Sequence, residues 1–155
     1  MHPNVAHVAE VLAGAGATGE IRTLPAAATT AKSAAAQLGI EVGAIANSLV
    51  FSADGEPLLV LTSGAHRVDT GRISTLVGAD RIERATPDFV RAATGQPIGG
   101  VAPIGHPAPV RTLVDTALAA HDVVWAAAGT PHTVFATSYD ELVALTGGRP
   151  AAVGD

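Results

Sequence analysis

The chain has no cysteine among its 155 residues, which excludes disulfide bridges, thiolate metal sites and a cysteine nucleophile. This absence also fits a reducing compartment, and we expect a cytoplasmic protein. Aromatic residues supply only 3% of the chain, so the core must be built mainly from Val, Leu, Ile and Ala. Apolar residues make up 48% and charged residues 15%, a balance that favours a folded domain over disorder.

Basic targeting segments and long hydrophobic runs are also missing. The first residues lack a basic region followed by an apolar run, and apolar stretches such as Val123 to Ala128 are too short to span a bilayer. We therefore expect a soluble protein without a signal peptide or a membrane partner. The net charge of −5 disfavours binding to DNA or other long nucleic acids, but it matters less for a protein that holds one terminal nucleotide.

Three widespread catalytic motifs are absent. They are the phosphate-binding loop Gly-x-x-x-x-Gly-Lys-Ser/Thr, the nucleophile elbow Gly-x-Ser-x-Gly and the zinc motif His-Glu-x-x-His. The six histidines show no close pairing that would suit a zinc site. We therefore expect neither a metal ion nor another cofactor.

The chain shows no repeat, charge block or linker, so a single domain over residues 1–155 is expected. Apolar periodicity and capping residues predict helices at Asn4–Gly14 (with Asn4 as N-cap), Thr29–Gly39, Thr70–Val77, Pro87–Gly95 and Ser138–Gly147. Apolar and β-branched runs predict strands at Glu20–Leu24, Ile45–Ser52, Pro57–Thr62, Arg81–Arg84, Ile98–Val101, Arg111–Asp115, Val123–Ala128 and Thr133–Ala136.

These elements do not alternate strictly, and Asp54-Gly55 between two apolar runs predicts a hairpin. A doubly wound parallel sheet is therefore disfavoured. The sequence predicts a mixed α/β (α+β) fold, in which helices surround a central, mixed and partly barrel-like sheet.

The most distinctive stretch is the loop Gly95–Pro107. Glycines at positions 99 and 100 would let the backbone approach a ligand closely, and Pro103 and Pro107 would hold the loop's amides in place. Such amides can bind a carbonyl oxygen or the oxyanion formed when an ester is attacked. An ordinary tight turn would give the same pattern.

Two further stretches carry polar side chains in apolar surroundings. Asn47 and Ser48 interrupt an apolar strand, which indicates either a pocket floor or a simple polar face. The stretch Ala128–Thr133 presents Thr130 and His132 on a turn after a strand, where His132 is either a proton shuttle or a solvated histidine.

Taken together, these stretches resemble a known family. The matching segments, in chain order, are Thr30–Gly39, Ile45–Phe51, Leu61–Asp69, Gly99–Pro107, Ala128–His132 and Glu141–Gly147. They are similar to the prolyl-tRNA synthetase editing-domain superfamily, in particular to its free-standing YbaK/ProX-like members. The resemblance covers almost the whole chain.

The resemblance implies hydrolysis of the ester that joins a wrong amino acid to a tRNA 3′ end, without metal or protein nucleophile. It implies candidate catalytic residues Asn47, Gly99, Gly100, Val101, Ala102 and Pro103. It implies candidate substrate-binding residues Ser48, His66, His106, Gly129, Thr130 and His132. The chain departs from the family where Asn47 replaces a strand lysine, because a neutral amide cannot offset phosphate charge.

Three functions stay open at this point. The first is a trans-editing deacylase for a small amino acid such as Ala, Cys or Ser, on tRNA-Pro or a related tRNA. The second is a weak or inactive binding module of the same fold, which recognises a tRNA end or a small amino-acid-like ligand. The third is a hydrolase of some other ester. An aminoacyl-tRNA synthetase is a candidate partner, and monomer and homodimer are both open.

Overall fold

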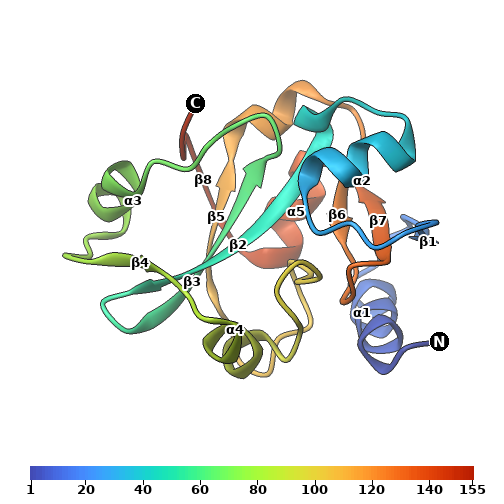
Figure 1. Ribbon diagram of the computed structural model, residues 1–155, viewed down its shortest axis with the longest axis horizontal. Coiled ribbons are helices and arrows are strands. Elements are labelled where there is room, and N and C mark those ends of the chain that lie inside the picture. Colours follow the sequence, from blue (N-terminus) through green and yellow to red (C-terminus); the bar gives the residue numbers. More distant parts are fainter.

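The computed structural model describes residues 1–155 and shows one sheet surrounded by helices (Figure 1). The helices are α1 (Pro3–Gly14), α2 (Ala31–Leu38), α3 (Thr70–Val77), α4 (Pro87–Thr94) and α5 (Tyr139–Thr146), with 3-10 turns η1 (Val42–Ala44) and η2 (Thr116–Ala120). The strands are β1 (Ile21–Thr23), β2 (Ile45–Ala53), β3 (Glu56–Ser63), β4 (Ile82–Arg84), β5 (Arg111–Asp115), β6 (Val124–Ala127), β7 (Thr133–Thr137) and β8 (Arg149–Ala151). No helix is both long and apolar enough to cross a membrane.

The strands form one mixed sheet in the order β1-β7-β6-β2-β3-β5-β8, and β4 pairs with β2 outside this path. Pairs β1–β7, β6–β7, β2–β3 and β2–β4 are antiparallel, whereas β2–β6, β3–β5 and β5–β8 are parallel. The mixed α/β fold predicted from the sequence is confirmed.

The sheet splits beside the middle of β2, and this split positions the site. β2 pairs with β6 only through Ile45 and Ala46. Farther along the same edge, β2 pairs with β4 only from Phe51 onward. The β2 edge between these two pairings therefore has no neighbouring strand.

Most helix ends follow directly from the sequence. The Thr30 hydroxyl accepts from the Ser33 N–H at 3.1 Å, and Gly39 ends α2 in the left-handed region at φ 69°. The helix α1 begins earlier than expected, because His2 rather than Asn4 is its N-cap. The Asn4 side chain instead donates to the Gly129 carbonyl at 3.1 Å. The prediction of an Asn4 cap was therefore wrong.

Two short segments differ from the sequence-based expectation. Ile98–Val101 is a turn and not a strand, because the Gly100 N–H donates to the Pro97 carbonyl at 2.9 Å and Gly99 adopts φ +86°. The strand β8 was not predicted, because it is only three residues long and contains Pro150.

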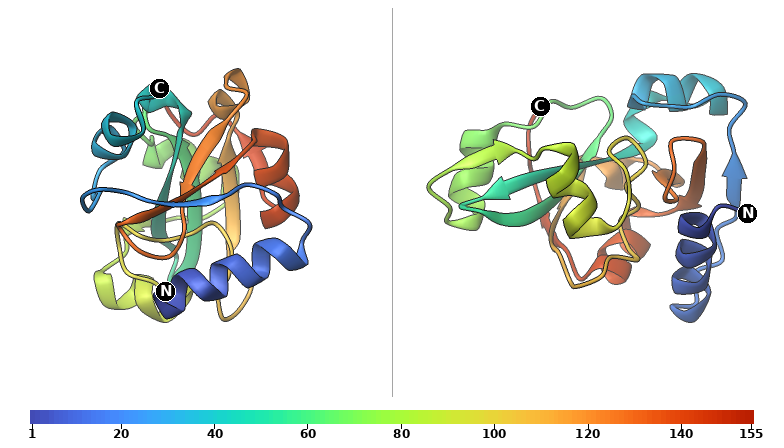
Figure 2. Two further views of the ribbon diagram at one scale, coloured as in Figure 1. Left: turned by 90° about the vertical axis from the view of Figure 1, so that its right-hand side faces the viewer. Right: turned by 60° about the horizontal axis from the view of Figure 1, so that its bottom comes forward.

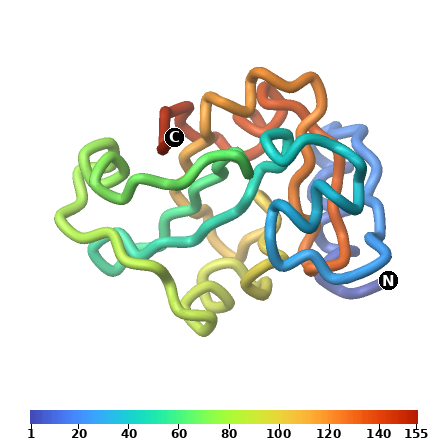
Figure 3. Tube along the Cα trace, turned by 45° about the horizontal axis from the view of Figure 1, so that its top comes forward, coloured from blue at the N-terminus to red at the C-terminus, as the bar shows by residue number.

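Three apolar clusters hold the helices on the sheet. The largest contains 16 buried residues and joins α1, α4 and α5 to one face, among them Leu12, Val90 and Leu142. Two smaller clusters lie under α3 and α2. Figure 2 shows α1 and α5 on the side of the sheet away from α2, and Figure 3 shows the segment between β3 and α3 running beside β2.

Candidate functional site

Two connected cavities open at the split in the sheet. An inner pocket lies between β2, β6, α2 and the turn after β6, and an outer groove continues along β2 toward β4 and the β3–α3 segment. The residues that line both cavities mark their junction: Thr29, Thr30, Ala31, Asn47, Ser48, Gly99 and Val101.

Asn47 and Ser48 reach this junction from the middle of β2. Successive side chains of a strand point to opposite faces, and Asn47 pairs with Thr62 while Ser48 pairs with Leu61. Ser48 therefore shares its face with Leu61, the face on which Val101 packs. Its Oγ is buried and has no hydrogen-bond partner in the protein. An unpaired buried hydroxyl costs about 1–3 kcal/mol, so a hydrogen bond between this group and a ligand or a water molecule would be favourable.

The backbone of Ser48 also faces the split. The Ile45 carbonyl accepts from Gly64 on the β3 side, whereas the Val50 carbonyl accepts from Ala85 on the opposite side. Backbone groups of a strand alternate between its two edges. The N–H and C=O of Ser48 therefore point to the edge where pairing with β6 has ended.

The glycine loop contributes two free amides. The Gly100 N–H donates to Pro97 at 2.9 Å, the Ala102 N–H donates to the Gln96 Oε1 at 2.6 Å, and Pro103 has no N–H. The N–H groups of Gly99 and Val101 have no partner in the protein. Both residues line the junction of the cavities. These two amides are the available donors for a carbonyl oxygen or an oxyanion.

A buried glutamine, which the sequence analysis missed, holds this loop. Gln96 is 2% exposed, and its Nε2 donates to the Ile104 carbonyl at 3.4 Å while its Oε1 accepts from Ala102. The His106 Nε2 lies 2.8 Å from the Ala102 carbonyl. Burial lowers the pKa of His106 from its ordinary value, so the neutral ring donates to this carbonyl. A lone polar residue between a helix end and a proline was the available signal for Gln96.

Gly100 packs against the backbone of the turn after β6 and does not line either cavity. A Cβ at this position would lie 2.6 Å from the carbonyl carbon of Thr130 and 2.8 Å from the nitrogen of Pro131. Gly100 therefore lets the loop pack on the turn after β6, and its role beside a ligand stays a prediction. Gly99, at φ +86°, is the glycine that lines the junction.

The remaining candidates fall into two groups. Thr130 lines the inner pocket, and its Oγ1 lies 2.9 Å from the Thr133 Oγ1, while His66 lines the outer groove. Outside both cavities lie Gly100, Ala102, Pro103, His106, Gly129 and His132. His132 is exposed, which fits the alternative of a solvated histidine. The roles in binding or catalysis stay predictions for both groups.

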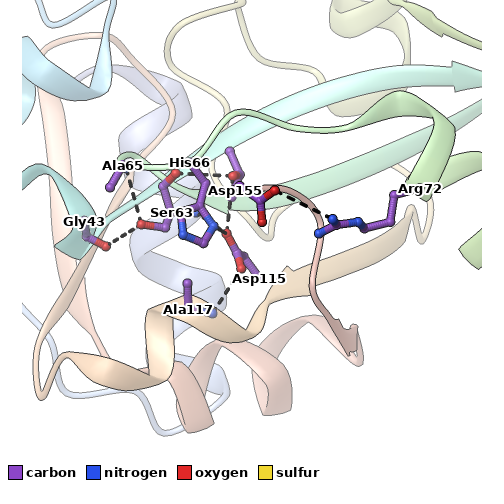
Figure 4. Close-up of polar contacts among 9 residues, drawn as sticks. Gly43, Ser63, Ala65, His66, Arg72, Asp115, Ala117 and Asp155 are labelled. Carbon is purple, nitrogen blue, oxygen red and sulfur yellow. Dashed lines mark hydrogen bonds and ion pairs between the residues drawn. The ribbon is translucent and has the colours of Figure 1, made fainter.

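A buried carboxylate contacts His66, which lines the outer groove (Figure 4). Asp115 is 1% exposed, and its carboxylate accepts from the N–H groups of Ser63 at 2.9 Å and Ala117 at 3.0 Å. The Nδ1 of His66 lies 3.1 Å from the Asp115 Oδ2, but the two groups are not aligned as a hydrogen bond. Sequence analysis missed this network, because Asp115 and His66 are far apart in the chain and meet only through the β3–β5 pairing.

Comparison with known proteins agrees with this geometry. Residues 25–145 match the model of the aminoacyl-tRNA editing domain, and the chain belongs to this family. It is 36% identical over 111 residues to a proline–tRNA ligase of Nitratidesulfovibrio vulgaris, covering 65% of this chain and 19% of the ligase. It is 32% identical over 129 residues to that of Solidesulfovibrio magneticus, covering 81% of this chain and 22% of the ligase.

A solved structure extends the similarity over the full chain. It is that of a candidate trans-editing enzyme for prolyl-tRNA synthetase, with 40% identity and a TM-score of 0.93, covering 100% of this chain and 99% of that one. By contrast, the chain spans less than a quarter of the length of the two ligases. The predicted family is therefore confirmed.

Proposed function

We propose that this protein is a trans-editing deacylase that hydrolyses the ester of a mischarged tRNA. The observation that carries the proposal is the unpaired, buried Oγ of Ser48 beside the unpaired amides of Gly99 and Val101. Three unpaired polar groups around one small cavity suit an acyl group, which offers a carbonyl oxygen and a neighbouring amine.

The reaction follows from this arrangement. A water molecule attacks the ester carbonyl, and the amides of Gly99 and Val101 stabilise the negative charge that develops on the oxygen. Collapse of the intermediate breaks the bond to the ribose oxygen, which regains a proton as the free amino acid leaves. Asn47 and Ser48 orient the terminal ribose and the acyl group from β2. Removing one such oxyanion donor from an enzyme typically costs 10²–10³-fold in rate.

The inner pocket favours a small amino acid. Its cavity volume is about 50 Å³, and Trp125 is among the residues that line it. The Arg22 guanidinium lies 5.0 Å from the centre of the Trp125 ring, where a cation–π contact helps to hold the indole in place. We infer Ala, Cys or Ser as the amino acid and tRNA-Pro or a related tRNA as its carrier, in the cytoplasm.

A binding module of the same fold is the alternative that Asn47 favours, because a neutral amide replaces a lysine there. A variant test separates the two functions. Activity in the wild-type protein excludes the inactive module, whereas an inert wild type that gains deacylation on Asn47→Lys supports it.

The decisive assay is a deacylation screen of the purified protein against a panel of mischarged tRNAs. We expect rapid release of a small amino acid and slow release of a large one from the same tRNA. Competition by uncharged tRNA identifies the tRNA as part of the substrate, since a hydrolase of other esters would not respond to it. No release from any member of the panel would contradict the proposal.

A further inference from the structure

The outer groove carries positive charge in an acidic protein. The charged and titratable side chains that line it are Arg67, Arg84 and His66, and no aspartate or glutamate is among its lining residues. The whole chain has a net charge of −5, and its acidic side chains lie outside the lining of this groove. This separation of charge would attract an anion to the groove.

The two arginines are free to bind that anion. Neither takes part in an ion pair, and both side chains are exposed. His66 differs, because its Nδ1 already faces Asp115. A guanidinium without a partner offers paired N–H donors that match a phosphate.

The backbones that carry these arginines are fixed. The Arg67 N–H donates to the Asp155 carbonyl at 2.8 Å, and Val68 forms a β-bridge with Gly154. Arg84 ends β4 opposite Phe51. Arg67 belongs to the β3–α3 segment, which passes above β2 in the view of Figure 1, whereas Arg84 belongs to β4, which pairs with the far end of β2.

We propose that Arg67 and Arg84 form a phosphate-binding site for the nucleotides that precede the acylated ribose of the RNA. The inference rests on the proposed function. The groove meets the inner pocket at Asn47, Ser48 and Gly99, so an RNA end whose acyl group occupies the pocket continues along the groove. An acidic peptide would meet the same charges, but it would lack the ribose ester for the pocket.

The test measures binding of an uncharged RNA hairpin, with the single-stranded 3′ end of a tRNA, as a function of salt concentration. Arg67→Ala and Arg84→Ala should each weaken binding about tenfold at low salt. Each should also make the negative slope of log association constant against log salt concentration shallower by about 0.7, the value for one phosphate contact on a single strand. Arg91→Ala is the matched control, because Arg91 is exposed and unpaired but lies outside the groove. It should leave the slope unchanged.

A second arm separates this inference from the deacylase itself. Hydrolysis of an aminoacyl-adenosine, which has no phosphate, should be equal in wild type and both arginine variants. Wild-type salt slopes in both variants would overturn the phosphate site even if deacylation is observed. A reduced slope in variants of a protein that hydrolyses nothing would support the phosphate site and overturn the deacylase. Binding of an acidic peptide but not of the hairpin would overturn the phosphate site.

Discussion

At the scale of single residues, Ser48 shows how function can oppose stability. Its Oγ is buried without a partner in the middle of β2, where an apolar side chain would give a more stable folded state. Ser52, farther along the same strand, differs because its hydroxyl accepts from the Gly55 N–H at 3.1 Å. The two serines therefore form a natural comparison.

We predict that Ser48→Ala raises the free energy of unfolding by up to ~1 kcal/mol while kcat/KM for deacylation falls about 2- to 10-fold. The lost activity reflects one hydrogen bond to the substrate. Urea unfolding and deacylation rates check the two effects. The control Ser52→Ala should show the reverse pattern, with slightly lower stability and unchanged activity. Lower stability in Ser48→Ala would contradict an unpaired hydroxyl.

Gly100 is the second residue with a sharp prediction. A methyl group at this position would clash with the backbone of Thr130 and Pro131, which cannot move without shifting the pocket turn. We expect Gly100→Ala to lower the free energy of unfolding by about 1–3 kcal/mol. The control is Gly14→Ala at the end of α1, where a Cβ meets no atom within 4 Å. It should be neutral or stabilising by ~0.5 kcal/mol, and equal effects of the two substitutions would contradict the close contact.

At the scale of elements, the glycine loop depends on a titratable group. Burial lowers the pKa of His106 below its ordinary value of 6.5, so the unfolded chain takes up a proton at a higher pH than the folded protein does. The contribution of His106 to the free energy of unfolding is therefore complete above about pH 6.5, and it is lost as the pH drops from there to the lowered pKa.

The predicted consequence concerns the stability of the protein in acid. His106→Gln keeps a donor for the Ala102 carbonyl but does not titrate. The free energy of unfolding, measured by urea titration between about pH 7 and 5, should fall less in this variant than in wild type. Other titrating groups are common to both proteins, so the difference reports His106. Identical pH dependence would show that the loop does not hold a neutral histidine.

The bounds of the helices and strands show how far local sequence signals predict secondary structure in this protein. Local signals placed the helix Thr70–Val77 at its observed bounds, and the cap Thr30 and terminator Gly39 are as expected. The segment Ile98–Val101 was mistaken for a strand, because its apolar composition was read without its turn hydrogen bond. Local composition therefore predicted most elements, except the glycine turn at Ile98–Val101 and the short strand β8, which contains Pro150.

At the scale of the whole molecule, the site depends on pairings between distant segments. Asn47, Ser48 and Gly99 could be proposed from the sequence, because polar and glycine residues stood out in apolar surroundings. The split between β2 and β6 could not be proposed from the sequence, because it depends on the pairing of the two strands, which stops at Ala46. The Asp115–His66 contact and the hydrogen bond from the Ala102 N–H to Gln96 could not be proposed either, because only the folded chain brings these groups together.

The central claim is that the acyl group occupies the inner pocket with its carbonyl oxygen on the free amides of Gly99 and Val101. A crystal structure with a non-hydrolysable alanyl-adenosine analogue tests it directly. We predict that oxygen within about 3.1 Å of both nitrogens and the Ser48 Oγ bonded to the ligand. An acyl group bound elsewhere, with both amides left free, would contradict the account.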